Sequence, residues 1–224
     1  MIFDPKVSHE ITIHFIRHAE TDENVCHPPR FGSANARITA RGREQAEKLG
    51  EYLREHQITP DIIYASHYER AHETAAIIAK SIGYQEQGII RDERLREISR
   101  GDWTGKLHSD VLDDCQRRSF REDAFDHRPP NGESMHDVSL RMDECFQMIA
   151  QTLNNRASIE FSKQMAIVVS HGRAIQALHA RFSQCRPELG WRYVLHNTSI
   201  TTFAHHMNDG WRIVRLNALP HLGL

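Results

Sequence analysis

Two short apolar segments, each followed at once by a histidine, constrain the fold of this chain most strongly. Ile11–Ile16 is a run rich in β-branched and aromatic residues that leads into Arg17-His18, and Met165–Ser170 is a second apolar run that leads into His171. Short runs of this kind are typical of buried strands. Because open α/β sheets bind ligands beyond the carboxyl ends of their strands, the two histidines are predicted to meet at one edge of a sheet.

Helical periodicity and turn residues divide most of the remaining chain into alternating helices and strands. The predicted helices run from Ala40 to about His56 behind a Thr39 cap, from about Ala71 to Gly83, from Ser134 onward and across 175–182. The predicted strands are 62–65 and 88–91, with a terminal hairpin of 199–204 and 211–216 turned at 208–210. This order predicts a three-layer α/β sandwich, with helices on both faces of a mainly parallel sheet and antiparallel strands at one edge.

The chain reads as one domain over residues 1–224, because no repeat, linker or low-complexity segment divides it. Residues 106–130 are mixed in charge and weakly periodic, and they are predicted to form a cap over the site. The rim of the pocket is expected from 25–37 and from this cap. Its candidate residues are Arg30, Phe31, Arg117, Arg118, Phe120 and Arg121.

Composition excludes several classes of partner. A formal net charge of −2 and a pI near 6.8 provide no overall basic field for nucleic acid. No apolar run approaches the ~20 residues of a membrane span, and the first residues lack the layout of a signal peptide. The cysteines at 26, 115, 145 and 185 are widely separated, as in a reduced cytoplasmic protein. No His, Cys and carboxylate set has metal-ligand spacing, so neither a metal nor a cofactor is expected.

A second arginine reaches the same predicted edge of the sheet. The segment Ser66–Arg70 follows the strand 62–65 and places Arg70 near the start of a helix, as Arg17 follows the first strand. Arginine recognises carboxylate and phosphate through paired N–H donors. A phosphate monoester is close to dianionic at neutral pH, so Arg17 and Arg70 would nearly balance its charge without a metal.

With these residues in place, the chain resembles the histidine phosphatase superfamily, which includes cofactor-dependent phosphoglycerate mutase. The resemblance covers nearly the whole sequence as a series of motifs in the same order. The similar segments are Arg17-His18-Ala19-Glu20-Thr21 with Asn24, Ile38 to Ala46, Ser66 to Arg70 with Thr74-Ala75, Leu95-Arg96-Glu97 with Gly101-Asp102-Trp103 and Gly105, Pro130 to Ser134, Ser170-His171-Gly172, and Asn197-Thr198-Ser199. Two positions differ from the family, which usually has glycine at 19 and commonly has glycine at 131.

The resemblance implies a role for each site residue. His18 would be the nucleophile that forms a phosphohistidine, and Glu97 would be the general acid and then the base. The residues implied to hold the phosphoryl group are Arg17, Arg70 and His171, with Thr21, Asn24 and Gly172 as further substrate-binding positions. Spacing alone does not separate Glu97 from Glu93 or Asp102 as the acid.

The resemblance favours a phosphatase over a mutase. Phosphoglycerate mutases of the family carry a long insertion after the acid segment, and here only residues 106–130 fill that interval. The alternatives are mutase-type phosphoryl transfer and a non-catalytic phosphate-binding scaffold, although the nucleophile and the acid are both present. A phosphorylated small molecule is the expected substrate, and a phosphoprotein stays open. The sequence does not name the substrate or the oligomeric state.

Overall fold

A six-stranded sheet forms the centre of the computed structural model, which describes residues 11–111, 125–160, 163–184, 193–206 and 209–223. The strands are β1 (Ile11–Arg17), β2 (Ile62–Ser66), β3 (Ile90–Asp92), β4 (Gln164–Ser170), β5 (Ile200–His206) and β6 (Gly210–Ala218). Their order is β3-β2-β4-β1-β5-β6. The first four in that order are parallel, and β5 and β6 add antiparallel pairs at the other edge.

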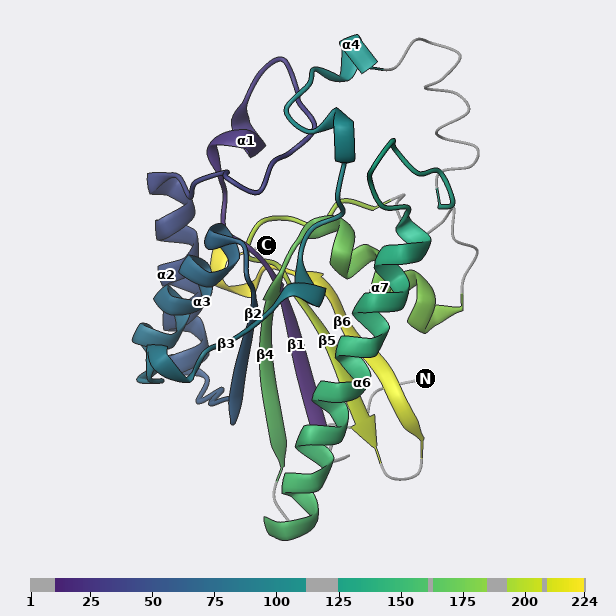
Figure 1. Cartoon of the computed structure of the whole chain (residues 1–224). Coiled ribbons are helices and arrows are strands. Elements are labelled where there is room, and N and C mark those ends of the chain that lie inside the picture. Colours follow the sequence, from purple (N-terminus) through teal and green to yellow (C-terminus); the bar gives the residue numbers. More distant parts are fainter. Residues whose placement is uncertain (1–10, 112–124, 161–162, 185–192, 207–208, 224) are drawn as a thin grey trace.

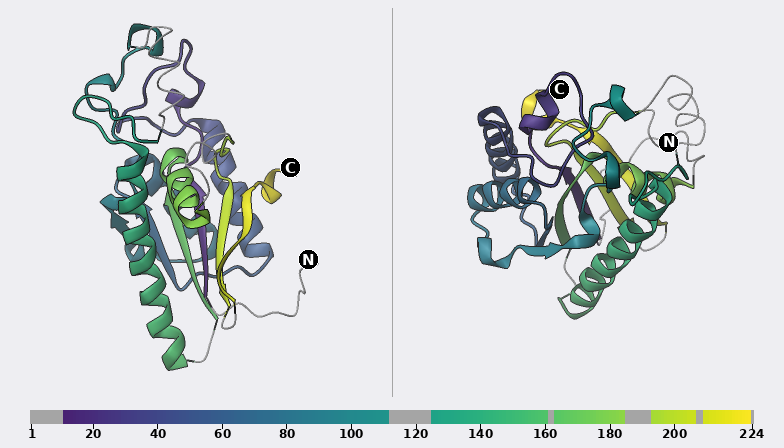
Figure 2. Two further views of the ribbon diagram at one scale, coloured as in Figure 1. Left: turned by 90° about the vertical axis from the view of Figure 1, so that its right-hand side faces the viewer. Right: turned by 45° about the horizontal axis from the view of Figure 1, so that its top comes forward.

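Helices cover both faces of this sheet (Figure 1). The α-helices are α1 (Asp22–Val25), α2 (Ala40–Glu55), α3 (Glu69–Ile82), α4 (His108–Val111), α6 (Met135–Glu160) and α7 (Gly172–Ser183). Short 3-10 turns cover Glu86–Gly88, Glu93–Leu95, Gly101–Trp103 and Pro220–Leu222. Figure 2 shows the sheet between α6 and α7 on one side and α2 and α3 on the other. The predicted three-layer α/β fold is confirmed.

The alternation of side chains along β1 builds the two halves of the core. Phe15 packs toward α6 and α7, where its ring meets Phe203 edge to face at 5.6 Å between centroids. The next residue, Ile16, belongs to the opposite cluster with Leu49 of α2 and Ile78 of α3. Successive strand residues point to opposite faces, so one apolar strand holds both helical layers in place beneath the histidine that follows it.

The predicted element boundaries hold closely for the longer elements. The Thr39 hydroxyl caps α2 by accepting from the Gly42 amide at 3.0 Å, and Gly83 ends α3 in the left-handed conformation with φ 75°. The strand predicted at 88–91 is displaced to Ile90–Asp92. Residues 112–124, which include Arg117, Arg118, Phe120, Arg121 and Cys115, lie outside the described residues, as does Cys185.

Buried His14 of β1 makes the free energy of unfolding sensitive to pH. Its Nδ1 lies 2.9 Å from the Thr202 hydroxyl, and burial, with Arg215 as a lesser cause, lowers its pKa from 6.5 to about 4. As the pH falls below 6.5, His14 binds a proton in the unfolded chain but stays neutral in the folded chain. The free energy of unfolding therefore decreases. We expect the lowered pKa of His14 to decrease the free energy of unfolding by about 2 kcal/mol when the pH falls from 7.5 to 5.

Urea unfolding of the wild type and of His14→Gln at the two pH values isolates this contribution, because other titrating groups act equally on both proteins. The variant should be less stable at pH 7.5 but should lose less stability at pH 5. An equal loss in both proteins would mean that His14 is not the titrating group.

Candidate active site

The register of β1 and β4 brings two histidines together at the carboxyl edge of the sheet. Arg17 pairs with Ser170 across the two parallel strands, so the residues that follow, His18 and His171, leave the sheet side by side. Their ring centroids are 5.1 Å apart and both side chains are buried. In Figure 1 this edge lies beneath α1 and α4. The predicted meeting of the two strand-end histidines is confirmed.

The local backbone fixes the protonation of His18. Its Nδ1 lies 2.8 Å from the Ala19 carbonyl oxygen. A carbonyl can only accept, so Nδ1 carries the proton and Nε2 keeps a lone pair. Burial, with the charges of Arg17 and Arg70 as lesser causes, holds the pKa of His18 well below 6.5. The imidazole is therefore neutral at physiological pH, which is the state that a nitrogen nucleophile requires.

The two ring nitrogens of His171 are buried polar atoms. Neither of its ring nitrogens has a hydrogen-bond partner among the described residues, although the side chain is fully buried. Burial, followed by the charge of Arg70, holds its pKa well below 6.5. Buried polar atoms without partners are rare in folded proteins, so a bound group that hydrogen-bonds His171 would remove a cost that the fold otherwise carries.

Two arginines lie beside these rings. Arg70, buried at the start of α3, donates from Nη1 to the carbonyl oxygens of Ser33 at 2.9 Å and Ala34 at 3.3 Å. Arg17 donates from Nη1 to the Leu195 carbonyl at 2.5 Å. Both guanidinium groups thus interact with carbonyls, which hold them in place without neutralising their charge.

Of the three carboxylates that spacing left open as the acid, Glu97 is the one that lines the cavity beside His18. Its Oε1 accepts from the Ile98 amide at 3.0 Å and its Oε2 accepts from the Arg173 amide at 3.3 Å. Asp102 instead accepts from the Asn131 side chain at 3.2 Å and is exposed. Glu93 is also exposed and does not line the cavity.

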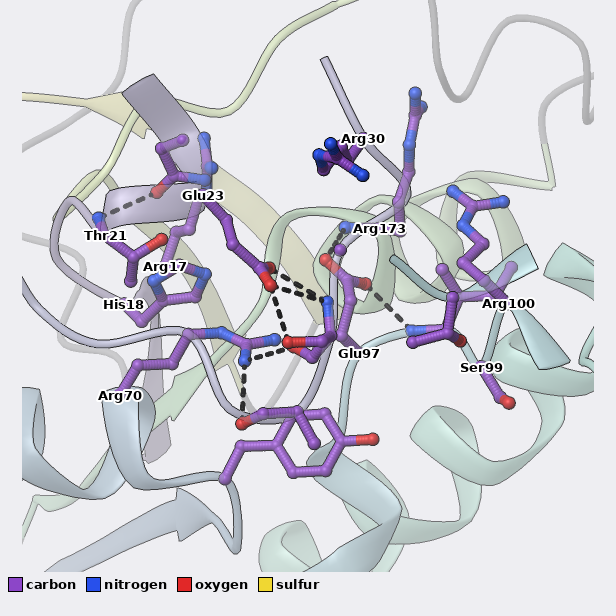
Figure 3. Close-up of a pocket in the computed structure, with 17 residues that line it drawn as sticks. Arg17, His18, Thr21, Glu23, Arg30, Arg70, Glu97, Ser99, Arg100 and Arg173 are labelled. Carbon is purple, nitrogen blue, oxygen red and sulfur yellow. Dashed lines mark hydrogen bonds between the residues drawn. The ribbon is translucent and has the colours of Figure 1, made fainter. Parts of the chain in front are cut away.

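These groups enclose a cavity of about 310 Å³ (Figure 3). Six of the predicted site residues line it, namely Arg17, His18, Thr21, Asn24, Arg70 and Glu97. His171 lies against the His18 ring, whereas Gly172 lines an adjoining cavity of about 240 Å³ together with Arg17, Glu97 and Arg173. The arrangement brings a neutral imidazole, fixed cations and a carboxylate to one small space.

Sequence reasoning missed three charged residues of this cavity: Glu23, Arg100 and Arg173. Glu23 accepts from the Ser33 amide at 2.9 Å and from the Ser33 hydroxyl at 2.5 Å, so it anchors the same loop that Arg70 contacts. The one local signal was the position of Glu23 inside the segment 17–24. Arg100 and Arg173 come from a loop and from the start of α7, and no motif marked them.

A side-chain network supports the turn after His18. Asn24 accepts at Oδ1 from the Thr21 amide at 3.1 Å and from the Asn197 amide group at 3.0 Å. Asn197 also donates to the His18 carbonyl at 2.9 Å. Asn197 therefore holds the backbone of His18 directly, and Asn24 links Asn197 to the backbone of Thr21.

The two departures from the family are accommodated without loss of a reacting group. Ala19 is buried, donates its amide to the Thr74 hydroxyl at 3.0 Å, and is absent from the described residues with positive φ. Asn131 adopts φ 56°, in the left-handed region that asparagine tolerates better than most residues. Its side chain then donates to Asp102, as described above.

The expected rim is present in part. Residues Arg30, Gly32, Ser33 and Ala34 line the cavity, whereas Phe31 is buried beneath them. No described residue of the segment 106–130 lines it, and the role of that segment as a cap stays a prediction. No group of three or more His, Cys, Asp or Glu side chains within the described ranges could hold a metal ion. None of the described helices has the length and apolar character needed to cross a membrane.

Comparison with known proteins finds a family and relatives that match most of this chain. The model of the histidine phosphatase superfamily (branch 1) matches residues 13–219. Glucosyl-3-phosphoglycerate phosphatase of Mycobacterium tuberculosis is 30% identical over 215 residues, which cover 91% of this chain and 92% of the relative. A probable phosphoglycerate mutase of an Enterobacter species is 30% identical over 219 residues, covering 95% of each chain.

Solved structures show the same similarity. The native structure of the mycobacterial glucosyl-3-phosphoglycerate phosphatase aligns with a TM-score of 0.76 and 27% identity, covering 92% of this chain and 98% of that one. The predicted family is confirmed, and the phosphatase relatives support the predicted hydrolase activity. By the match over most of its length, the chain belongs to branch 1 of the histidine phosphatase superfamily.

Proposed function

We propose that this protein hydrolyses phosphate monoesters through a phosphohistidine on His18. The observation that carries the proposal is the contact of His18 Nδ1 with the Ala19 carbonyl, which leaves an unprotonated Nε2 beside Arg17, Arg70 and His171. A buried neutral imidazole with a fixed tautomer is suited to nucleophilic attack. The neighbouring cations would bind the phosphoryl oxygens while negative charge develops on them.

In the first step, the Nε2 lone pair of His18 forms a bond to phosphorus while the bond from phosphorus to the ester oxygen breaks. Glu97 in its acid form gives its proton to the departing oxygen, which leaves as an alcohol. Arg17, Arg70 and His171 hold the three equatorial oxygens. Positioning and electrostatic stabilisation supply most of the rate in phosphoryl transfer. The three side chains come from the end of β1, from the start of α3 and from the residue after β4.

In the second step, the Glu97 carboxylate takes a proton from a water molecule, whose oxygen attacks the phosphohistidine. The bond from nitrogen to phosphorus breaks, inorganic phosphate leaves, and His18 returns to its neutral form. Glu97 regains its proton and is ready for the next ester. The two backbone amides that Glu97 accepts from keep its carboxylate at the wall of the cavity.

The test of this function is release of inorganic phosphate from p-nitrophenyl phosphate and from a panel of phosphorylated metabolites. Activity should survive excess EDTA, because fixed arginines supply the charge that metals give other phosphotransferases. A protein that binds phosphate but turns over no ester would be the scaffold alternative. Loss of activity in EDTA that Mg²⁺ or Zn²⁺ restores would contradict the metal-free mechanism.

Mutase-type transfer is the second candidate, because a probable phosphoglycerate mutase is among the relatives. The two reactions differ in whether water reaches the phosphohistidine. Incubation with 3-phosphoglycerate separates them: a phosphatase releases phosphate, whereas a mutase forms 2-phosphoglycerate.

Replacing Glu97 by glutamine should harm phosphorylation of the enzyme most for esters with poor leaving groups. General acid catalysis contributes roughly 10²- to 10⁴-fold, and alkyl oxygens need the proton more than phenols that leave as anions. The measurement is the pre-steady-state phosphorylation rate across esters of rising leaving-group pKa. An identical loss for all of them would remove Glu97 as the acid, and Glu23, which lines the same cavity, would be tested next.

The proposed substrate is a phosphorylated small molecule, because a cavity of about 310 Å³ lies at the low end of the roughly 300–1,000 Å³ of small-molecule sites. We further propose a cytoplasmic location. Cys26 and Cys145 support it, since neither forms a disulfide within the part of the chain that the structure describes, and disulfides are rare in the reducing cytosol.

A further inference from the structure

An ion pair outside the cavity, Arg141 with Glu133, packs against the loop that carries Glu97. Arg141 lies in the second turn of α6, Glu133 lies two residues before that helix, and neither lines the cavity. Their side chains expose only 11% and 13% of their surface, and Arg141 donates from Nε at 2.9 Å and from Nη2 at 3.0 Å to the two carboxylate oxygens. Taking two charges out of water costs free energy that their attraction often only offsets, so stability alone is a poor reason for this pair.

Arg141 also binds the backbone of residues 94–97. Its Nη1 donates to the Arg94 carbonyl at 2.6 Å and to the Arg96 carbonyl at 2.8 Å, and its Nη2 donates to the Glu97 carbonyl at 3.3 Å. One guanidinium group therefore joins three carbonyl oxygens, including that of the proposed acid. The planar fork of donors that distinguishes arginine from lysine permits this arrangement.

Glu133 holds the backbone on the other side of Glu97. Its Oε2 accepts from the Ser99 amide at 2.9 Å, and its own amide donates to the Ser99 carbonyl at 2.9 Å. Its Oε1 accepts from Arg96 Nη2 at 2.6 Å. Burial alone would raise the pKa of Glu133, but its hydrogen bonds and the charge of Arg141 hold that pKa below the usual 4.5. The carboxylate is therefore an anion at neutral pH.

The loop itself provides little regular structure at this point. The 3-10 turn Glu93–Leu95 is tied to β4 by the Ser170 hydroxyl, which donates to a carbonyl of that turn at 2.7 Å. The residues from there to the next 3-10 turn belong to no helix or strand. Past the first turn, Arg141 and Glu133 thus bind the backbone on both sides of Glu97 in place of a helical or strand ladder.

We propose that Arg141, oriented by Glu133, is a positioning residue for proton transfer by Glu97. A general acid acts only within hydrogen-bond reach of the leaving oxygen, and a misplacement of about 1 Å can cost ~10²-fold in rate. By fixing the backbone at Glu97, Arg141 sets where that carboxyl group lies in the cavity. The inference rests on the proposed phosphatase function, in which Glu97 gives the leaving oxygen its proton.

The first test replaces Arg141 by methionine, which is long and flexible but has no donors. Arg96 still pairs with Glu133 in this variant, so that carboxylate keeps a cation. The pre-steady-state phosphorylation rate should fall by about 10- to 100-fold on an alkyl phosphate. It should fall much less on p-nitrophenyl phosphate, whose phenolate leaves readily without a proton. Inhibition by vanadate should stay as in the wild type, because the phosphoryl end of the cavity is unchanged.

The second test is a double-mutant cycle with Glu97→Gln. Glutamine cannot give a proton, so a residue that acts through the acid has nothing left to position. Adding Arg141→Met to Glu97→Gln should therefore change the alkyl phosphate rate little, although the same substitution is costly in the wild type. Additive losses would mean that Arg141 acts on another part of the site.

Two further variants complete the set. Arg141→Lys keeps a charge beside Glu133 but presents a single ammonium group, so it should show the same selective loss to a smaller extent, and it supplies the comparison if Arg141→Met does not fold. Arg181→Met is the matched control, because Arg181 also pairs with an acidic residue of α6, Asp143, at 2.7 Å, but is exposed and does not line the cavity. It should leave both esters at wild-type rates. Thermal unfolding measures the stability of each variant separately.

An equal loss on the alkyl and the p-nitrophenyl ester in Arg141→Met would overturn the positioning role and leave the ion pair as a support of the fold. Wild-type rates on both esters would overturn it as well. Failure of the proposed function gives different results. Either the wild type releases phosphate from no ester, or Glu97→Gln alone loses rate equally for all leaving groups.

Discussion

Replacing His18 by alanine should lower turnover of every phosphate monoester by on the order of 10⁴-fold or more, since the variant lacks the nitrogen that would accept the phosphoryl group. The wild type mixed with phosphorus-labelled substrate and quenched in alkali should carry label that is stable to base and lost in acid. His18→Ala should carry none. The fold should persist, because the turn after β1 is also held by Asn197 and by the Ala19 contact with Thr74.

The matched control is His56→Ala, which removes an exposed imidazole at the far end of α2. The helix begins near the site, where Thr39 donates to Glu20, and its 16 residues extend about 24 Å from there. This variant should keep wild-type turnover and labelling. Label that persists in His18→Ala would assign the nucleophile to another residue, with His171 the first to be tested because its ring is adjacent.

Replacing Arg70 by alanine should reduce kcat/KM by ~10³-fold or more on every ester, because the loss falls on the phosphoryl oxygens that all substrates share. An arginine placed on the transferring group acts mainly in the transition state. Arg70→Lys should recover part of the rate, since lysine restores the charge without the fork of donors. Inhibition by vanadate should weaken in parallel with the rate.

Arg212→Ala is the control, because Arg212 is exposed on β6 and pairs with Asp209 outside the cavity. Arg70 also contacts the carbonyls of Ser33 and Ala34, so a structural effect must be separated from a catalytic one. Thermal unfolding measures the first and substrate kinetics measure the second. A variant that binds vanadate as the wild type does would show that Arg70 stabilises the loop and does not bind the phosphoryl group.

Local sequence determined most of the secondary structure. The strands β1 and β4 were predicted within a residue or so, because each is a short apolar run bounded by polar residues. Thr39 and Gly83 marked helix ends through capping and positive φ, both of which depend on residues close in the chain. The displaced β3 shows the limit: residues Glu86–Gly88 form a 3-10 turn, closed by the Ile89 amide on Glu86, and only pairing with β2 defines where the strand begins.

The same limit applies to the site. His18, His171, Arg17 and Arg70 could be located from sequence because each lies at or just beyond a strand end, where the chain path itself sets the position. The remaining pocket residues come from loops and helix starts whose apolar pattern says little about where their side chains lie.

The family resemblance pointed to Glu97, whereas residue spacing alone did not separate it from Glu93 and Asp102. In the structure, Glu97 is the one of the three that lines the cavity, where it accepts from the amide of Arg173, 76 positions away. The tertiary structure also placed Arg100 and Arg173 in the lining of the cavity. Periodicity is a property of neighbours in the chain and determines strands and helices. The charge of a pocket depends on residues that are far apart in the chain and come together only when the helices and loops pack against the sheet. Tertiary packing therefore determined it.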